Sequence, residues 1–176
     1  GSFHANQYYN PANPEAHYVS TAPELWDQTQ GNFDCFVAGM GTGGTISGCG
    51  KFFKEKNPKM RIVGVDPIGS LYYEYVKTGR MTRPFSYYVE GIGEDFLPGT
   101  MNLKIIDEII RVDDKECFLM TRALVREEGI LCGGSCGAAA QQQSDCHFRE
   151  RSVGVKFGNS LARIRRRHHR QERSIR

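Results

Sequence analysis

A short segment rich in glycine and threonine carries the clearest chemical signal in this sequence. Residues 39–45 read Gly-Met-Gly-Thr-Gly-Gly-Thr, and they follow an apolar run and precede a helical pattern. Glycine lets backbone N–H groups converge on an anion, because no Cβ blocks the close approach. Threonine hydroxyls and the unpaired N–H groups at the start of the following helix add further donors. The sequence therefore predicts a phosphate cradle formed by Gly41, Thr42, Gly43, Gly44 and Thr45.

A second glycine-rich loop, residues 132–137, bears on what the first loop binds. A phosphorylated ring cofactor needs an anion cradle at one end and a hydroxyl partner for a ring nitrogen at the other, and Ser135 is a candidate for that partner. A neutral hydroxyl would leave such a nitrogen unprotonated, which favours β-elimination and β-replacement chemistry. The local sequence equally permits Ser135 to cap a helix that begins near Gly137.

A dinucleotide is the competing ligand for the first loop. Gly39, Gly41 and Gly44 match the pattern G-x-G-x-x-G, and Asp66 ends the next apolar segment at the distance of about 20 residues that is typical of dinucleotide-binding folds. A fragment of an NAD-binding oxidoreductase is therefore an alternative. It leaves the loop at residues 132–137 unexplained, because a dinucleotide site needs only one such loop.

The elements around these loops alternate between strand and helix. Apolar periodicity and breaking residues predict helices over residues 15–30, 46–56 and 113–128, with a turn or break at Pro23, and strands over residues 33–38, 61–66 and 108–112. Asp113 and Glu116 have the spacing of a capping box at the start of the third helix. This alternation predicts an α/β fold with a mainly parallel sheet and flanking helices.

The composition argues against several classes of protein. No apolar stretch approaches the roughly 18–20 residues that span a bilayer, and the first residues lack the pattern of a signal peptide, so we expect a cytoplasmic protein without a membrane partner. The six cysteines lack the spacing of a disulfide framework, and we expect buried, reduced thiols. Cys132, Cys136, Cys146 and His147 fit no strong zinc template, so we expect no metal site.

Charge is unevenly distributed along the chain. Residues 149–176 contain 10 Lys/Arg and 2 acidic residues (+8), whereas residues 1–148 contain 13 and 18 (−5), which gives the net charge of +3. Some basic tails bind nucleic acid through phosphate contacts. We favour a solvated tail and no nucleic-acid partner, because no aromatic interleaving and no recognised nucleic-acid module accompany the charge.

Five blocks of the chain, in order, resemble one enzyme family. They are residues 6–17, 41–45, 65–67, 89–98 and 132–137. Together they resemble the cystathionine beta-synthase and cysteine synthase family, whose members are fold-type II pyridoxal-phosphate enzymes. Within that family, residues 90–98 are more similar to the cystathionine beta-synthase branch. The resemblance implies an incomplete catalytic domain, residues 1–140. The basic tail, residues 141–176, departs from the family's pattern, so we expect it to be disordered or aberrant, with low structural order from about Gln141 onward.

The resemblance also implies a cofactor and a set of site residues. Pyridoxal phosphate would place its phosphate in the loop at residues 41–45, and Ser135 would bond its pyridine nitrogen. Gln7 would lie near the substrate carboxylate and Gly91 on the loop that faces the active site, although an ordinary loop role for Gln7 and a turn role for Gly91 fit these residues as well. The implied substrates are serine and homocysteine, which β-replacement joins as cystathionine, and the implied assembly is a homodimer.

The catalytic lysine of the family has no counterpart in this sequence. In the family it precedes the first block, and no lysine here lies in a matching context, so we expect the lysines to be solvated surface charges. We therefore expect no catalytic residue and no turnover from this chain alone. Two further alternatives stay open, which are a cysteine synthase acting on O-acetylserine and sulfide, and a non-catalytic fragment that associates with an intact subunit.

Overall fold

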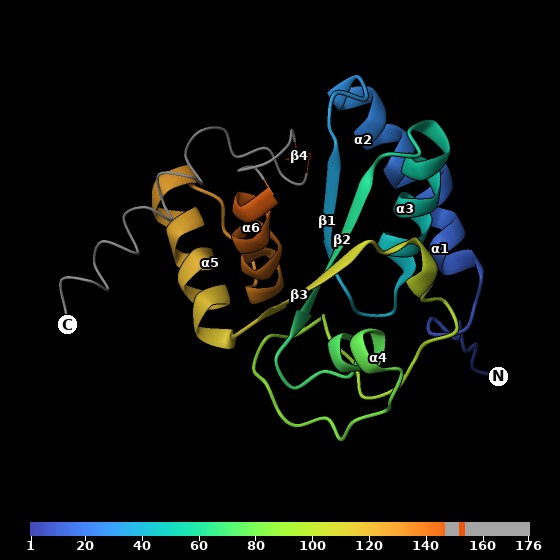
Figure 1. Cartoon of the computed structure of the whole chain (residues 1–176), viewed down its shortest axis with the longest axis vertical. Coiled ribbons are helices and arrows are strands. Elements are labelled where there is room, and N and C mark those ends of the chain that lie inside the picture. Colours follow the sequence, from blue (N-terminus) through green and yellow to red (C-terminus); the bar gives the residue numbers. More distant parts are fainter. Residues whose placement is uncertain (147–151, 154–176) are drawn as a thin grey trace.

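The computed structural model describes residues 1–146 and 152–153, and a parallel β-sheet lies at its centre (Figure 1). The strands are β1 (Cys35–Gly39), β2 (Arg61–Pro67), β3 (Glu108–Val112) and the two-residue β4 (Ser152–Val153). They lie in the order β3-β2-β1-β4, and every described pairing is parallel. In register, Cys35 is opposite Arg61 and Val63 is opposite Glu108. The predicted α/β fold with a mainly parallel sheet is confirmed.

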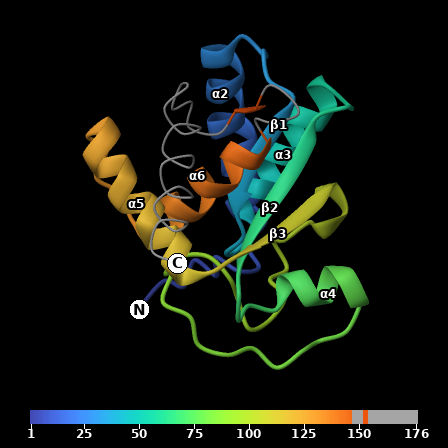
Figure 2. The ribbon, with the colours of Figure 1, turned by 60° about the vertical axis from the view of Figure 1, so that its left-hand side comes forward.

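Helices cover both faces of this sheet (Figures 1 and 2). One face carries α1, η1, α2 and α3, and the opposite face carries α5 and α6. The helical elements are α1 (Ala12–Ala16), the π-helical turn η1 (His17–Thr21), α2 (Ala22–Thr29), α3 (Gly44–Lys56), α4 (Tyr72–Thr78), the 3-10 turn η2 (Leu103–Ile105), α5 (Asp114–Glu128) and α6 (Gly134–Cys146).

The two faces are built by the alternation of side chains along each strand. In β1, Phe36 belongs to the core shared with α3, where it packs beside Phe53. Its neighbour Val37 belongs to a second core, which includes Ala138 of α6. Because both faces of β1 are buried, the strand is apolar at nearly every position, as is usual in a parallel sheet.

The helical segment from α1 to α2 contains the break predicted at Pro23, in the form of a π turn. Proline has no N–H, and its ring clashes with the carbonyl four residues earlier in a regular helix. The chain widens just before this proline, where the N–H of Ala22 donates to the carbonyl of His17, five residues back. The helix therefore continues through the turn with one additional residue.

The carboxyl ends of β1, β2 and β3 meet at one edge of the sheet, at which α3 and α6 begin (Figure 1). Parallel strands require this arrangement, because each helix must run back to the opposite edge before the next strand starts. The glycine loop that joins β1 to α3 and the start of α6 therefore lie at the same edge, which is where open α/β sheets bind ligands.

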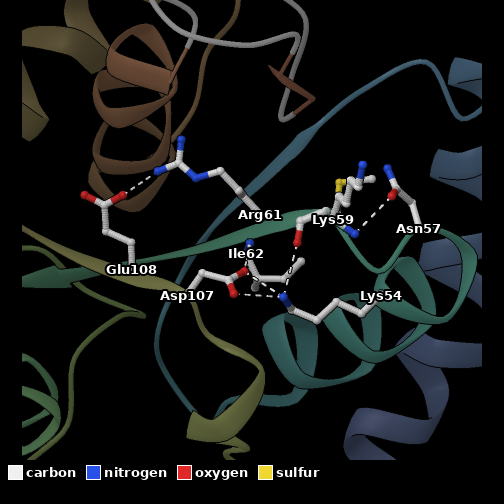
Figure 3. Close-up of polar contacts among 8 residues, drawn as sticks. Lys54, Asn57, Lys59, Arg61, Ile62, Asp107 and Glu108 are labelled. Atoms are coloured by element: carbon white, nitrogen blue, oxygen red, sulfur yellow. Dashed lines mark hydrogen bonds and ion pairs between the residues drawn. The ribbon is translucent and has the colours of Figure 1, made fainter.

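The far end of α3 is fixed to the opposite edge of the sheet by polar contacts (Figure 3). Lys54 Nζ lies 2.8 Å from Asp107 Oδ2 and donates to the carbonyl of Met60. The same carboxylate accepts the N–H of Ile62 at 2.7 Å. The expectation that the lysines are solvated surface charges is thus wrong for Lys54, because its ammonium is shared between the starts of β2 and β3.

The sequence-based expectation for the end of the chain is wrong for residues 141–146. Helix α6 runs through Cys146, and Gln142 within it is buried. Apart from β4, the rest of the basic tail lies outside the described residues, so its expected disorder stays a prediction. No helix in the described residues is long and apolar enough to cross a membrane.

The cysteines divide into two groups. Cys35, Cys49 and Cys117 are buried and form no disulfide, as expected. Cys132 is half-buried and Cys136 is exposed, so the expectation of buried thiols is wrong for Cys136. Within the described part of the chain, no three His, Cys, Asp or Glu side chains are grouped to hold a metal ion.

Candidate functional site

The loop between β1 and α3 is packed so closely that its glycines admit no side chain. Gly43 has φ +87°, and a Cβ there would lie 2.6 Å from the Cα of Met101. A Cβ on Gly41 would lie 2.8 Å from the carbonyl oxygen of Gly91, and one on Gly44 would overlap the side chain of Asn13. The glycines therefore let three other segments close around the loop.

The start of α3 presents unused hydrogen-bond donors at this loop. The N–H groups of Thr45 and Ile46 have no acceptor among the described residues, as expected for the first turn of a helix. Because α3 is 13 residues long, its amino-terminus also carries a partial positive charge. A loop with free N–H groups, hydroxyls and this charge suits a phosphate.

The hydroxyls of the two cradle threonines are contacted by residues of the preceding helix. Asn13 Nδ2 donates to Thr42 Oγ1 at 3.0 Å and to the carbonyl of Gln7 at 2.9 Å. His17 Nε2 lies 3.2 Å from Thr45 Oγ1. The structure thus brings Gln7 beside the cradle through its backbone, while its side chain is exposed.

No role was predicted for Asn13 or His17. They are four residues apart, and a helix places such residues on the same face, but this spacing alone does not reveal which loop that face meets. The contacts to Thr42 and Thr45 join residues 29 and 28 positions apart in the chain.

The segment that contains Gly91 crosses over the cradle. The N–H of Gly93 donates to the carbonyl of Met40 at 2.6 Å, and the hydroxyl of Tyr72 donates to the carbonyl of Gly41 at 2.6 Å. Gly91 itself has φ +82° and borders Gly41. The structure therefore brings Gly91 next to the loop, and the backbone there turns in the left-handed region that favours glycine.

Thr100 connects the cradle to the amino-terminal loop. Its hydroxyl donates to the carbonyl of Thr42 at 2.6 Å, and its N–H donates to the carbonyl of Tyr8 at 3.1 Å. The ring of Tyr8 packs 5.0 Å from that of Phe96. The charge of Glu94 raises the pKa of Tyr8, and burial raises the pKa of Glu94. Tyr8 therefore packs against Phe96 and also interacts with the carboxylate of Glu94.

Ser135 lies at the same edge of the sheet but in a different setting from that expected. It is the second residue of α6, which begins at Gly134, so its alternative role as a cap of a helix beginning near Gly137 is wrong. Its side chain is half-buried. Its helix starts at the edge where the cradle lies, although no described hydrogen bond joins the two.

Asp66, the acidic residue of the dinucleotide pattern, faces the interior. It is fully buried, and its Oδ2 accepts the N–H of Tyr73 at 2.9 Å, whereas its Oδ1 has no partner among the described residues. Burial raises its pKa to about 6, against the opposing effect of the hydrogen bond from the N–H of Tyr73. A carboxylate in this position is not available to a ribose, which argues against the dinucleotide alternative.

Comparison with known proteins agrees with this geometry. Residues 1–150 match the model of a family described as pyridoxal-phosphate dependent enzyme. The chain is 48% identical over 134 residues to cystathionine beta-synthases of Dictyostelium discoideum and Apis mellifera, a match that covers 76% of this chain and 26% of each relative. It is 37% identical over 160 residues to cysteine synthase A of Escherichia coli, which covers 88% of this chain and 50% of that protein. The chain thus spans a quarter to a half of the length of these relatives.

Proposed function

Because this chain belongs to the family of pyridoxal-phosphate-dependent enzymes that includes cystathionine beta-synthase and cysteine synthase, we propose that its glycine loop binds the cofactor phosphate in an enzyme of β-replacement. In the proposed reaction the sulfur of homocysteine replaces the hydroxyl of serine and gives cystathionine. The observation that carries the proposal is the β1–α3 loop, whose free N–H groups and threonine hydroxyls meet at the carboxyl edge of the sheet.

The cradle residues fit a phosphate dianion because they offer several backbone N–H and hydroxyl donors in one place. Gly41, Thr42, Gly43, Gly44 and Thr45 would bind the phosphate, and the hydroxyl of Ser135 would donate to the ring nitrogen. When bound, pyridoxal phosphate supplies an electron sink that stabilises a carbanion at the substrate Cα. A serine hydroxyl carries no charge, so Ser135 would leave the ring nitrogen unprotonated, which suits loss of a β-substituent.

Two residues beside the cradle are proposed to contact the amino-acid substrate. The exposed side chain of Gln7 has amide donors for a carboxylate, and its backbone is held to Asn13 next to Thr42. Gly91 borders Gly41 and has no side chain to occupy the space over the loop. The proposed substrates are therefore serine and homocysteine, which enter on the side of the cradle where these residues lie.

Cysteine synthesis from O-acetylserine and sulfide is the second candidate function. It is favoured by one observation, which is that the match to cysteine synthase A covers 88% of this chain, compared with 76% for the cystathionine beta-synthases. The higher identity to the cystathionine beta-synthases, 48% compared with 37%, favours the first candidate.

We also propose that no lysine of the described residues supplies the catalytic amine. Lys54 is paired with Asp107, and Lys51, Lys56 and Lys77 lie over the rings of tyrosine or phenylalanine. The 176-residue chain is therefore expected to bind pyridoxal phosphate without turning over serine. The cytoplasmic location and the homodimer also stay predictions.

Binding of the cofactor tests the proposed site. The chain is titrated with pyridoxal phosphate, followed by visible absorbance, and then competed with inorganic phosphate. Thr42→Val removes one proposed phosphate donor and is expected to weaken binding by about tenfold, the value of one charge-assisted hydrogen bond. Thr78→Val is the matched control, because the Thr78 hydroxyl donates to the carbonyl of Glu74 within α4. Equal affinities in the two variants would contradict the assignment.

Reconstitution tests the reaction. The chain is co-expressed with the part of the catalytic domain of Dictyostelium cystathionine beta-synthase that lies outside the match. Cystathionine formed from serine and homocysteine supports the first candidate, whereas faster formation of cysteine from O-acetylserine and sulfide supports the second. Complexes that bind the cofactor but catalyse neither reaction would contradict both.

A further inference from the structure

Asn13 and His17 contact the two threonine hydroxyls of the cradle from one side. They lie one helical turn apart, Asn13 in α1 and His17 at the start of η1. Asn13 Nδ2 is 3.0 Å from Thr42 Oγ1, and His17 Nε2 is 3.2 Å from Thr45 Oγ1. This pairing of two residues with two hydroxyls bears on the direction in which each hydroxyl proton points.

The Thr42 hydroxyl already accepts two hydrogen bonds, so only its proton remains for a bond to a ligand. A hydroxyl has one donor and two acceptor lone pairs. Thr42 Oγ1 accepts from Asn13 Nδ2 and, at 3.4 Å, from the N–H of Gly44. These two donors occupy the acceptor positions, and the hydroxyl proton has no acceptor among the described residues. The proton is therefore available to an anion held in the loop.

At Thr45 the direction of the proton depends on the tautomer of His17. The other ring nitrogen, Nδ1, lies 3.0 Å from Thr21 Oγ1. If Thr21 donates to Nδ1, the ring carries its proton on Nε2 and donates to Thr45, whose own proton is then free to point at an anion. If the ring proton is on Nδ1, Thr45 must donate to Nε2 and would turn a lone pair toward the anion.

We infer that Asn13 and His17 are positioning residues for a bound phosphate, acting as donors that oblige the hydroxyls of Thr42 and Thr45 to point their protons at it. The inference rests on the proposed phosphate site and deepens it. It requires that the ring of His17 carries a proton on Nε2 whenever an anion occupies the cradle.

The tautomer of His17 is measured directly on the 176-residue chain. Histidine is labelled isotopically, and long-range proton–nitrogen spectra are recorded with and without inorganic phosphate, and again with pyridoxal phosphate. His17→Gln identifies the signals of His17, and the exposed His4 is the internal reference. A ring protonated on Nε2 with the anion bound supports the inference. A neutral ring protonated only on Nδ1 overturns it.

Affinity for inorganic phosphate gives an independent test. Asn13→Leu and His17→Phe keep the approximate volume but remove the donor, and each is expected to weaken binding by about tenfold. His17→Gln retains an N–H at the place of Nε2 and is expected to stay within about threefold of the unaltered chain. Unfolding midpoints of the variants are compared first, so that a loss of folding is recognised.

The outcomes separate this inference from the proposed function. Tenfold losses in Asn13→Leu and His17→Phe, with recovery in His17→Gln, support the inference. Unchanged affinities in all three variants overturn it and leave the phosphate site in place. A chain that is folded but binds neither inorganic phosphate nor pyridoxal phosphate overturns both the site and the inference.

Discussion

Replacing Gly43 with alanine should both strain and crowd the cradle. At φ +87° an alanine costs roughly 1–2 kcal/mol relative to glycine. The new Cβ would also lie 2.6 Å from the Cα of Met101, and a main-chain atom cannot turn aside as a flexible side chain can. Overpacking of this kind typically costs about 1–3 kcal/mol. We therefore expect Gly43→Ala to lower the free energy of unfolding by about 2–5 kcal/mol.

Gly129→Ala is the matched control for this prediction. Gly129 also has positive φ, +69°, at the end of α5, but nothing lies within 4 Å of a Cβ placed there. Gly129→Ala should therefore lower the free energy of unfolding by the conformational cost alone, about 1–2 kcal/mol. The difference between the variants isolates the close approach of residue 101 to the loop.

Urea unfolding provides the assay. The chain has one tryptophan, Trp26, which packs against Phe33 and Phe53 in the core beside α3, so its fluorescence reports unfolding of this region. Midpoints and slopes give the free energy by linear extrapolation. If the free energies of unfolding of Gly43→Ala and Gly129→Ala agree within about 0.5 kcal/mol, the usual error of such differences, the packing argument is refuted.

Three other predictions follow from the polar groups. Asp107→Asn should lower the free energy of unfolding, measured in urea, by about 1–2 kcal/mol. This is less than charged hydrogen bonds can contribute, because the Asp107 carboxylate is partly exposed. Glu108→Gln removes a more exposed ion pair and should change the free energy of unfolding by less than about 1 kcal/mol. Because the pKa of Asp66 is raised to about 6, its protonated form stabilises the fold below the ordinary carboxyl value of 3.8, and this contribution is lost as pH rises through about 6. Asp66→Asn should remove a decline on the order of 3 kcal/mol between pH 4 and pH 7, measured by urea unfolding at each pH, and an unchanged pH profile would contradict it. Exposed Cys136 should react with iodoacetamide, as followed by mass spectrometry, whereas buried Cys117, whose pKa is raised to about 12, should stay unmodified until the chain unfolds.

The parts of the fold that the sequence predicts well depend on neighbouring residues. The strand over residues 108–112 and the helix that follows were predicted at or within one residue of their bounds. The capping residue of that helix is confirmed, because the carboxylate of Asp113 accepts the N–H of Glu116 at 2.9 Å. Apolar spacing, a capping carboxylate and a terminal glycine all lie within these segments, so no distant contact is needed to recognise them.

The surroundings of the cradle depend on distant contacts and could not be predicted in this way. The loop glycines were predicted from the sequence. These positions require glycine because Met101, Gly91 and Asn13, from three other segments, lie close to the loop. The start of α6 was placed three residues too late, because successive glycines weaken the local helix signal that packing against α5 overrides. The assigned binding roles of the cradle residues and Ser135 stay predictions.

The π turn has a consequence for how the chain tolerates changes in length. One additional residue rotates the following helix by about 100°. The face that presents Asn13 and His17 to the loop is thereby rotated relative to the face that buries Ala22 and packs Trp26 against the core. Loss of a single residue from this segment would restore a regular helix, but would turn one of these two faces toward solvent. The segment is therefore constrained in length as well as in composition, unlike the surface loops that accept insertions and deletions.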